Sequence, residues 1–281
     1  EEGKMVASSI FSEKMNRQLL HKDFAILYRT NAQSRAMEEA LRKINIPYKI
    51  YGGQSFYQRK EVKDLLAYFR VVINPNDEEA LRRIINYPTR GIGKTTLEKL
   101  MLAANQLQAS LWQVMEKSGQ LGFKNMGHID DFVTMIKSFQ TLTNRNAYDV
   151  AMHIAKQSGV LKALYEDKTL EGIARYENTE ELLNGIKEFS IEEIIDEDGV
   201  VKVRTLEEFM ADVALLTNDD KDKDQNQDHV SLMTIHSAKG LEYKYVYVVG
   251  LEENLFPSQM ALNSRQDLEE ERRLFYVAIT R

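Results

Sequence analysis

The chain has 281 residues, of which 43% are hydrophobic and 28% are charged, values that are ordinary for a soluble globular protein. It contains no cysteine, which excludes disulfides and cysteine-based zinc sites, and no apolar run that could form a transmembrane helix. The formal net charge of −6 argues against a wholly basic surface for coating nucleic acid, although local patches can still bind phosphate.

The two ends of the sequence and its length suggest how it is organised. The opening residues, EEGKMVASSI, lack the basic and apolar stretches of a signal peptide, so we expect a cytoplasmic protein without a membrane partner. The length favours two domains, because single cores stop growing near about 250–300 residues. The first residue is Glu and the last, Arg281, ends a motif, so we expect a piece of a longer chain.

Residues 1–58 have the pattern of an α/β unit. After a helix over residues 2–18, the apolar segments Phe24–Tyr28 and 46–51 are typical of buried strands. Between them a polar loop, residues 29–34, leads into a helix for which Ser34 is the expected N-cap. Strand, helix and strand at this spacing predict a βαβ unit with parallel strands and a right-handed crossover.

The middle of the chain changes to helix after helix, from about residue 61 to 209, with no strand expected before about Val200. A polar run over residues 218–228 is either a flexible linker or a solvated loop. Strands resume at Val230. We therefore predict an α/β domain, residues 1–58 and 225–281, interrupted by a helical insertion over residues 59–224. Arg29 and His236 both follow strands and could converge at the carboxyl edge of a shared sheet.

The segment RGIGKTT, residues 90–96, imitates a nucleotide-binding P-loop but does not fit one. Aligned on its Gly-Lys-Thr, the first glycine of that motif falls on Pro88, and the preceding text is helical. A better interpretation is helix, glycine turn and helix, with Thr95 and Glu98 as a capping box. Such a turn could grip a DNA phosphate, or it could be a plain helical hairpin. The candidate duplex-binding residues are Arg90, Gly91, Ile92, Gly93, Lys94 and Thr95.

The last fifty or so residues carry the pattern of a ligand site. Thr234, His236 and Lys239 stand in a short polar loop between two apolar strands, and such groups suit phosphate or sugar. Glu242 is expected inside the second strand, where it would contact ribose or form a structural salt bridge. In the closing helix we expect Leu268, Phe275 and Ile279 to face inward. Arg272 should be half-buried beside glutamates, and Arg281 should end the helix where a guanidinium could hold phosphate.

Several segments in order resemble motifs of the superfamily 1A, or UvrD/Rep-like, ATP-dependent DNA helicases. YRTNAQSR at 28–35, TIHSAKGLE at 234–242 and EEERRLFYVAITR at 269–281 are similar to motifs IV, V and VI. YGGQSFY at 51–57 and RGIG at 90–93 also match, so the resemblance covers essentially the whole chain. It implies that the flanking pieces form the second RecA-like domain, called 2A. The helical block would then be the inserted domain 2B.

The resemblance also implies roles for individual residues. Glu242 would contact the ATP ribose, and Arg281 would be an arginine finger that reaches the γ-phosphate. The single-stranded DNA path would include Arg29, Asn31, Thr234, His236 and Lys239, while the Gly-Ile-Gly element would contact duplex DNA. The family couples ATP hydrolysis to 3′→5′ translocation and strand separation, in DNA repair or replication.

The chain lacks the family's Walker A loop, the Asp-Glu pair that binds Mg²⁺ and the adenine-binding glutamine segment. These belong to the first RecA-like domain, which we expect as a partner outside this chain, and no metal site is expected within it. We therefore predict that the chain alone hydrolyses no ATP. The alternative function is a non-enzymatic module that binds duplex DNA or a partner protein.

Overall fold

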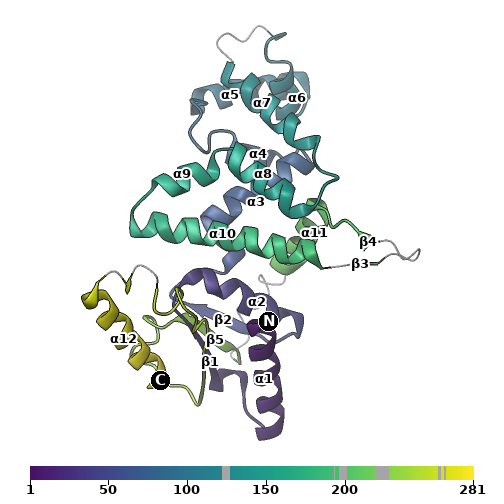
Figure 1. Ribbon diagram of the computed structural model, residues 1–281. Coiled ribbons are helices and arrows are strands. Elements are labelled where there is room, and N and C mark those ends of the chain that lie inside the picture. The colour runs from purple at the N-terminus through teal and green to yellow at the C-terminus, as the bar shows by residue number, and fades with distance from the viewer. Residues whose placement is uncertain (122–126, 193, 196–200, 219–227, 259–260, 263) are drawn as a thin grey trace. The chain divides into compact units, whose positions relative to one another are not determined.

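The computed structural model describes residues 1–121, 127–192, 194–195, 201–218, 228–258, 261–262 and 264–281 (Figure 1). The chain divides into two compact units. The sheet unit comprises Glu1–Arg59 and Leu215–Arg281, and the helical unit comprises Lys60–Ala214. The polar run predicted to be a linker or solvated loop, residues 218–228, falls almost wholly outside the described residues.

The sheet unit is built around parallel strands. In its described part, β1 (Phe24–Tyr28), β2 (Tyr48–Tyr51), β5 (Val230–Thr234) and β6 (Tyr245–Val248) form one sheet in the order β2-β5-β1-β6. All neighbouring pairs are parallel. Strand β5 lies between β1 and β2, so the two flanking pieces of the chain share one sheet. The predicted α/β class with a parallel sheet is confirmed.

Strand β1 is buried on both faces, which explains its unbroken apolar sequence. Its side chains alternate between two cores, as the two-residue period of a strand requires. Phe24, Ile26 and Tyr28 pack in one core, where α1 (Glu2–Arg17) and α2 (Ser34–Lys43) contribute apolar side chains. Ala25 and Leu27 pack in the other, with α12 (Arg265–Ile279). Figure 1 shows α1 and α12 on opposite sides of the sheet.

The prediction that Ser34 caps α2 is wrong. A short 3-10 turn, Asn31–Gln33, precedes the helix, so Gln33 is the N-cap residue and Ser34 is the first helical residue. The Ser34 hydroxyl instead donates to Glu38 Oε1 over 2.8 Å and accepts from Arg59 Nη2 over 2.7 Å. The Gln33 side chain accepts from the backbone amides of Arg29 and Thr30, each over 2.9 Å, which holds the loop after β1 in place.

The helical unit consists mainly of packed helices. The helix bounds are α3 Lys60–Ile73, α4 Glu78–Ile84, α5 Lys94–Leu107, α6 Leu111–Glu116, α7 Gly127–Gln140, α8 Ala147–Gln157, α9 Val160–Glu166, α10 Leu170–Ile191 and α11 Leu206–Asn218. The last four residues of α11 belong to the sheet unit. The expectation of no strand before about Val200 is wrong, because β3 (Ile194–Ile195) pairs with β4 (Val201–Lys202). Two residues per strand are too few to give a readable alternation.

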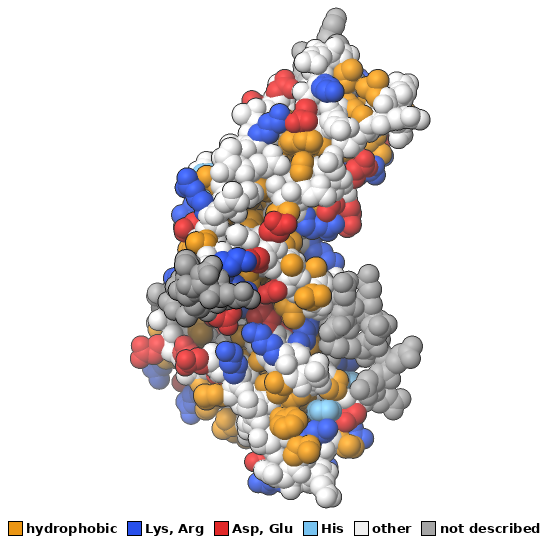
Figure 2. All heavy atoms as spheres, turned by 90° about the vertical axis from the view of Figure 1, so that its right-hand side faces the viewer, with side chains coloured by type: hydrophobic (Ala, Val, Ile, Leu, Met, Phe, Trp, Pro, Cys, Tyr) orange, Lys and Arg blue, Asp and Glu red, His pale blue; other side chains and the backbone are white. Residues whose placement is uncertain are grey.

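On the face drawn in Figure 2, Lys and Arg side chains are interspersed with Asp and Glu rather than gathered in one basic patch. Among the described helices, none is both long and apolar enough to cross a bilayer.

Candidate functional site

The loops that follow the four strands meet at one edge of the sheet, because parallel strands all end on the same side. The register pairs Tyr28 with Thr234, so Arg29 and the turn after β5 leave the sheet next to each other. The turn after β2 lies against both the loop after β1 and the turn after β5. A Cβ atom on Gly53 would lie 3.7 Å from Asn31 Oδ1, and one on Gly52 would lie 2.6 Å from Ser237 Oγ. The structure thus gathers the predicted single-strand residues at one edge.

The turn after β5 is arranged to present polar side chains. Ile235 and Ala238 are fully buried and anchor the turn in the core shared with α12. The Thr234 hydroxyl lies 3.0 Å from the Ser237 hydroxyl, and the Thr234 carbonyl accepts from the Ser237 amide over 3.0 Å. His236 and Lys239 are left exposed on the outer side. Buried and exposed residues therefore alternate within a single tight turn.

Arg29 is engaged by Glu271, a residue that the sequence did not single out as its partner. Arg29 Nε donates to Glu271 Oε1 over 2.9 Å and to Oε2 over 3.2 Å, and Nη2 donates to Oε1 over 2.6 Å. The Glu271 side chain is only 6% exposed and also accepts from the Ser258 amide over 3.3 Å. The two residues are 242 positions apart in the chain, so no local pattern could reveal the pair.

Arg29 and Glu271 also set the electrostatics around the turn. Partial desolvation of the imidazole, and then the charge of Arg29, lower the pKa of His236 below its ordinary value. Glu271 and Glu270 act in the opposite direction. The residue lies at the surface, yet its ring is crowded enough for desolvation to be the largest of these influences. The arrangement therefore favours neutral imidazole at pH 7.

The inward face of α12 differs from the prediction. Glu271, Leu274 and Ala278 are buried, at helical spacing, whereas Leu268, Phe275 and Ile279 are exposed. Arg272 is not half-buried, because its side chain is 79% exposed and pairs with Glu269 at 3.4 Å. The helix carries two possible apolar stripes, and the sequence alone does not say which one meets the sheet. The buried stripe is the one that contains Glu271.

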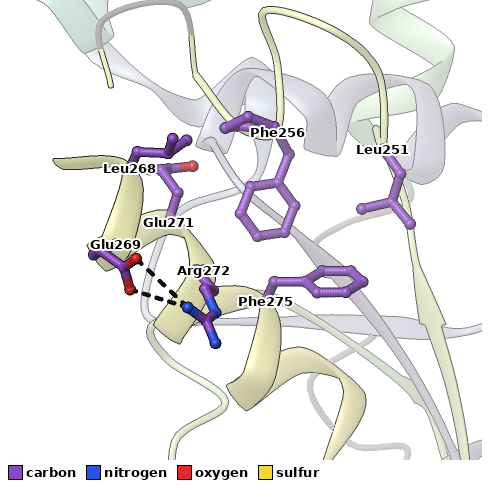
Figure 3. Close-up of a pocket in the computed structure, with 8 residues that line it drawn as sticks. Leu251, Phe256, Leu268, Glu269, Glu271, Arg272 and Phe275 are labelled. Atoms are coloured by element: carbon purple, nitrogen blue, oxygen red, sulfur yellow. Dashed lines mark hydrogen bonds and ion pairs between the residues drawn. The ribbon is translucent and has the colours of Figure 1, made fainter. Parts of the chain in front are cut away.

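Leu268 and Phe275 of the exposed stripe line a cavity of about 510 Å³ beside α12 (Figure 3). Its walls are Leu251, Phe256, Pro257, Leu268, Glu269, Glu271, Arg272 and Phe275. The rings of Phe256 and Phe275 meet edge to face, with their centroids 5.9 Å apart. In Figure 3 both rings lie on the same side of the helix as Leu251. The cavity is mostly apolar and was not predicted.

The two candidate ATP-binding residues are brought close together. Arg281 follows the end of α12, and its Nη1 donates to the Leu241 carbonyl over 3.2 Å. Its Nε donates to the Val277 carbonyl over 3.1 Å. Glu242, the residue after Leu241, is exposed and precedes β6 rather than lying inside the strand. The expected cost of burying that carboxylate therefore does not arise, and the placement inside a strand is wrong.

In the helical unit, the Gly-Ile-Gly turn is held from inside by Arg90. Its Nη1 donates to the carbonyls of Ile84 and Pro88, over 3.3 and 3.0 Å, and its Nη2 donates to Ser158 over 2.7 Å. The guanidinium also lies over the rings of Tyr68 and Phe132, 5.7 and 5.5 Å from their centroids. Arg90 therefore supports the turn instead of presenting a free charge.

The other residues of the turn divide into a buried and an open part. Ile92 is buried and Gly91 has a φ of +76°, a backbone conformation that favours glycine. A Cβ on Gly93 would meet nothing within 4 Å, and the Lys94 side chain is 89% exposed. The predicted Thr95–Glu98 capping box is wrong: Gly93 is the N-cap, α5 begins at Lys94, and no side chain caps it. A helix, α4, precedes the turn, as expected for a segment that is not a P-loop.

Residues able to bind a metal are not grouped in the described part of the chain. There, no cluster of three or more His, Cys, Asp or Glu could hold an ion. The exposed Glu242 and the guanidinium of Arg281, both at one surface, suit the sugar and phosphate of a nucleotide. They are too few to enclose one, so any nucleotide site here is a partial site.

Comparison with known proteins gives one family. The family model of the UvrD-like helicase C-terminal domain matches residues 1–281. The chain is 42% identical over 266 residues to DNA helicase II of Escherichia coli (strain K12), covering 92% of the chain and 35% of that protein. It is 37% identical over 289 residues to the ATP-dependent DNA helicase PcrA of Staphylococcus aureus (strain Mu50), covering 100% of the chain and 38% of that protein.

The chain thus spans little more than a third of the length of these relatives. The match extends over both compact units, and the α/β class with a parallel sheet agrees with the resemblance seen in the motifs. On these grounds the chain belongs to the UvrD-like helicase C-terminal domain family.

Proposed function

We propose that this chain is part of an ATP-dependent DNA helicase that moves 3′→5′ along single-stranded DNA. The observation that carries the proposal is the sharing of one sheet by two sets of candidate residues. Those expected to touch DNA follow β1 and β5, while Arg281 follows α12 and is bonded to the segment between β5 and β6. A shift of one set relative to the other would couple ATP hydrolysis to movement on DNA.

The nucleotide half of the proposal rests on Arg281 and Glu242. Arg281 would stabilise negative charge on the γ-phosphate, and Glu242 would accept the ribose hydroxyls. The remaining contacts, including the Mg²⁺ ligands, would come from the first RecA-like domain. The chain alone would then hydrolyse no ATP. DNA-stimulated ATPase activity in the purified chain that disappears with Arg281→Ala would contradict this statement.

The proposed binding of single-stranded DNA rests on the polar residues at the ends of β1 and β5 and in the loops that follow them. Thr234, His236, Lys239 and Asn31 would contact phosphate and sugar, which position a strand without reading its bases. Arg29 would act there from a position set by Glu271. A neutral His236 can donate one hydrogen bond and accept another, which suits sugar and phosphate groups of any sequence.

The duplex contact is assigned to the helical unit. Lys94, Gly93 and Thr95 stand at the open start of α5, where free amides and the helix dipole favour phosphate. Gly91 and Ile92 shape the turn, and Arg90 supports it from within. This contact would be insensitive to base sequence, as strand separation on arbitrary DNA requires.

The test of the proposed function uses the full-length protein with Arg281→Ala. The kcat for DNA-stimulated ATP hydrolysis should fall by about 10³–10⁵-fold, while single-stranded DNA affinity stays nearly intact. Arg273→Ala is the matched control, because Arg273 is an exposed arginine of the same helix that pairs with the exposed Glu270. A normal turnover number in Arg281→Ala would refute the finger role.

A second candidate function is a duplex-binding or partner-binding module without catalysis. The exposed Lys94 beside the open Gly93 favours it, because this surface lies in the helical unit and does not depend on a nucleotide. Lys94→Glu in the full-length protein discriminates between the two. Loss of all DNA binding would make the turn the dominant contact, whereas retained single-strand binding supports the helicase.

A further inference from the structure

We propose that Asn86 is a positioning residue that holds the Gly-Ile-Gly turn of the helical unit in the conformation that meets duplex DNA. The inference rests on the proposed duplex contact and deepens it. It assigns a role to a side chain that lies outside the turn, four residues before Arg90.

The Asn86 side chain binds two backbone amides of the turn with one oxygen. Its Oδ1 accepts from the Arg90 amide over 2.8 Å and from the Ile92 amide over 3.1 Å. Asparagine suits this task, because its short side chain reaches backbone amides a few residues further along the chain. The two bonds enclose Gly91, which has the left-handed φ of +76°. They therefore fix the backbone on both sides of the residue that makes the turn.

Packed helices support Asn86 and the turn. Asn86 comes two residues after the end of α4, where Ile84 is buried and its carbonyl accepts from the Tyr87 amide over 3.0 Å. The turn also has a neighbour in α7, because a Cβ on Gly91 would lie 3.4 Å from His128 Nε2. The turn therefore touches α7 directly and is tied to the end of α4 through Asn86.

The bonds to Asn86 divide the amides of the turn into two groups. The amides of Arg90 and Ile92 are satisfied by its oxygen, whereas in the described structure those of Gly91 and Gly93 have no hydrogen-bond acceptor. Both glycines are exposed. Amides at a glycine turn and at a helix start suit the oxygens of a phosphate. Since the Asn86 side chain is neutral, it orders the turn without placing a negative charge beside that phosphate.

A merely structural role for Asn86 makes a different prediction. Loss of the two bonds would then destabilise the protein and lower its apparent affinity for every DNA in the same proportion, because it lowers the folded fraction. A positioning role lowers only the part of the affinity that the duplex supplies. A ratio of two affinities separates these roles: the affinity for a duplex with a single-stranded tail, divided by that for the tail alone.

The experiment measures this ratio in the full-length protein by fluorescence titration with labelled DNA. Asn86→Ala should lower the ratio about tenfold, because two hydrogen bonds to the turn are lost, while the affinity for the tail alone stays within about twofold of wild type. Asn146→Ala is the matched control, since Asn146 Oδ1 also accepts a backbone amide of the helical unit, that of Tyr148 over 2.9 Å, but at the start of α8. This control should keep the wild-type ratio.

Asn86→Asp separates the geometry of the turn from its charge. The carboxylate can accept the same two amides but adds a negative charge near the expected phosphate. At about 0.3 M salt, where the added charge is screened, the ratio for Asn86→Asp should recover most of the wild-type value at that salt. The ratio for Asn86→Ala should remain low there. Equally low ratios for the two variants would contradict the role given to the two bonds.

The remaining outcomes also decide the matter. A wild-type ratio in Asn86→Ala would overturn the inference, as would equal losses in Asn86→Ala and Asn146→Ala. If Asn86→Ala does not fold, Asn86→Gln replaces it: this amide is one methylene further out, so a reduced ratio supports the inference and a wild-type ratio overturns it.

Lys94→Glu distinguishes failure of the inference from failure of the proposed function. A wild-type ratio in Lys94→Glu would refute the duplex contact itself, and the role of Asn86 with it. A reduced ratio in Lys94→Glu, together with a wild-type ratio in Asn86→Ala, would refute only the role of Asn86.

Discussion

Ser237 Oγ lies 2.6 Å from the point that a Cβ atom on Gly52 would occupy, and Gly52 has a φ of +74°. The turn after β2 is thus pressed against the turn after β5, and only glycine fits without movement. The contact joins the loop after β2 to the loop after β5 at the edge of the sheet where the parallel strands end.

Gly52→Ala should therefore destabilise the sheet unit by about 1–2 kcal/mol, the usual cost of a left-handed backbone for an L-residue. It should also weaken single-stranded DNA binding by displacing Ser237. Urea unfolding and fluorescence titration with a labelled oligonucleotide check both effects. Gly53→Ala is the control, because its Cβ would meet no atom closer than 3.7 Å and its φ is not in the left-handed region. Equal effects of the two substitutions would contradict the account.

Arg90 and Lys94 should separate stability from DNA binding in the helical unit. Arg90→Ala removes three bonds to carbonyl oxygens and two ring contacts, so it should lower the free energy of unfolding by about 2–4 kcal/mol. Lys94→Ala removes an exposed side chain and should leave unfolding unchanged while weakening duplex binding, most strongly at low salt. Thermal unfolding and duplex titrations would show the separation; a stable Arg90→Ala protein would contradict it.

The His236 imidazole should report on the Arg29–Glu271 pair. Since the charge of Arg29 lowers the pKa of His236, Arg29→Gln should raise that pKa, whereas Glu271→Gln should lower it further. Two-dimensional NMR of the imidazole through a pH titration measures both shifts. Arg17→Gln, which removes a charge that does not act on this ring, should leave the titration unchanged. Shifts of the same sign in Arg29→Gln and Glu271→Gln would refute the assignment.

The same group makes stability depend on pH in a defined direction. The folded-state pKa of His236 is lowered, so the unfolded chain binds the proton more readily. The stability that the folded state gains from keeping His236 neutral is fully present above the ordinary histidine pKa, about 6.5. It is lost as the pH falls below that value. His236→Gln should reduce the loss of stability between about pH 7 and pH 5, as followed by urea unfolding at each pH.

Substitutions of Leu274 and Leu268 test which apolar stripe of α12 packs against the sheet. Leu274 is 6% exposed and packs in the core beneath the sheet, whereas Leu268 is 43% exposed. Leu274→Ala should cost about 2–5 kcal/mol, the range for buried leucines, and Leu268→Ala much less. Urea unfolding of the two variants compares the same chemical change in two environments. A larger loss for Leu268→Ala would place the helix the other way round.

Strand β1 could be predicted because burial on both faces leaves an unbroken apolar run, Phe24–Tyr28. The parallel sheet followed from the single helix between the first two strands. The prediction of helix N-caps was wrong in two places, at Ser34 and at Thr95, for related reasons. A short turn in one case and a glycine in the other takes the cap position, and either is compatible with the same residue pattern.

The site could be predicted only in part. The motifs placed Arg29, Thr234 and His236 after strands, and the sheet brings those strand ends together. The partner of Arg29 could not be predicted from the sequence, because Glu271 is 242 residues away and is one of three consecutive glutamates. The role of Arg90 was equally hidden, since its acceptors are backbone carbonyls, which every sequence contains.

The position of β5 between β1 and β2 has a consequence for synthesis on the ribosome. The two outer neighbours of β5 emerge early, and the strand that must pair with both emerges only after the whole helical unit has been translated. Until then the nascent sheet lacks its bridging strand and exposes unpaired edges, which are prone to wrong pairing. The helical unit, by contrast, is continuous in the chain and can pack as it appears. Shielding of the nascent chain should therefore matter most for the first fifty-odd residues.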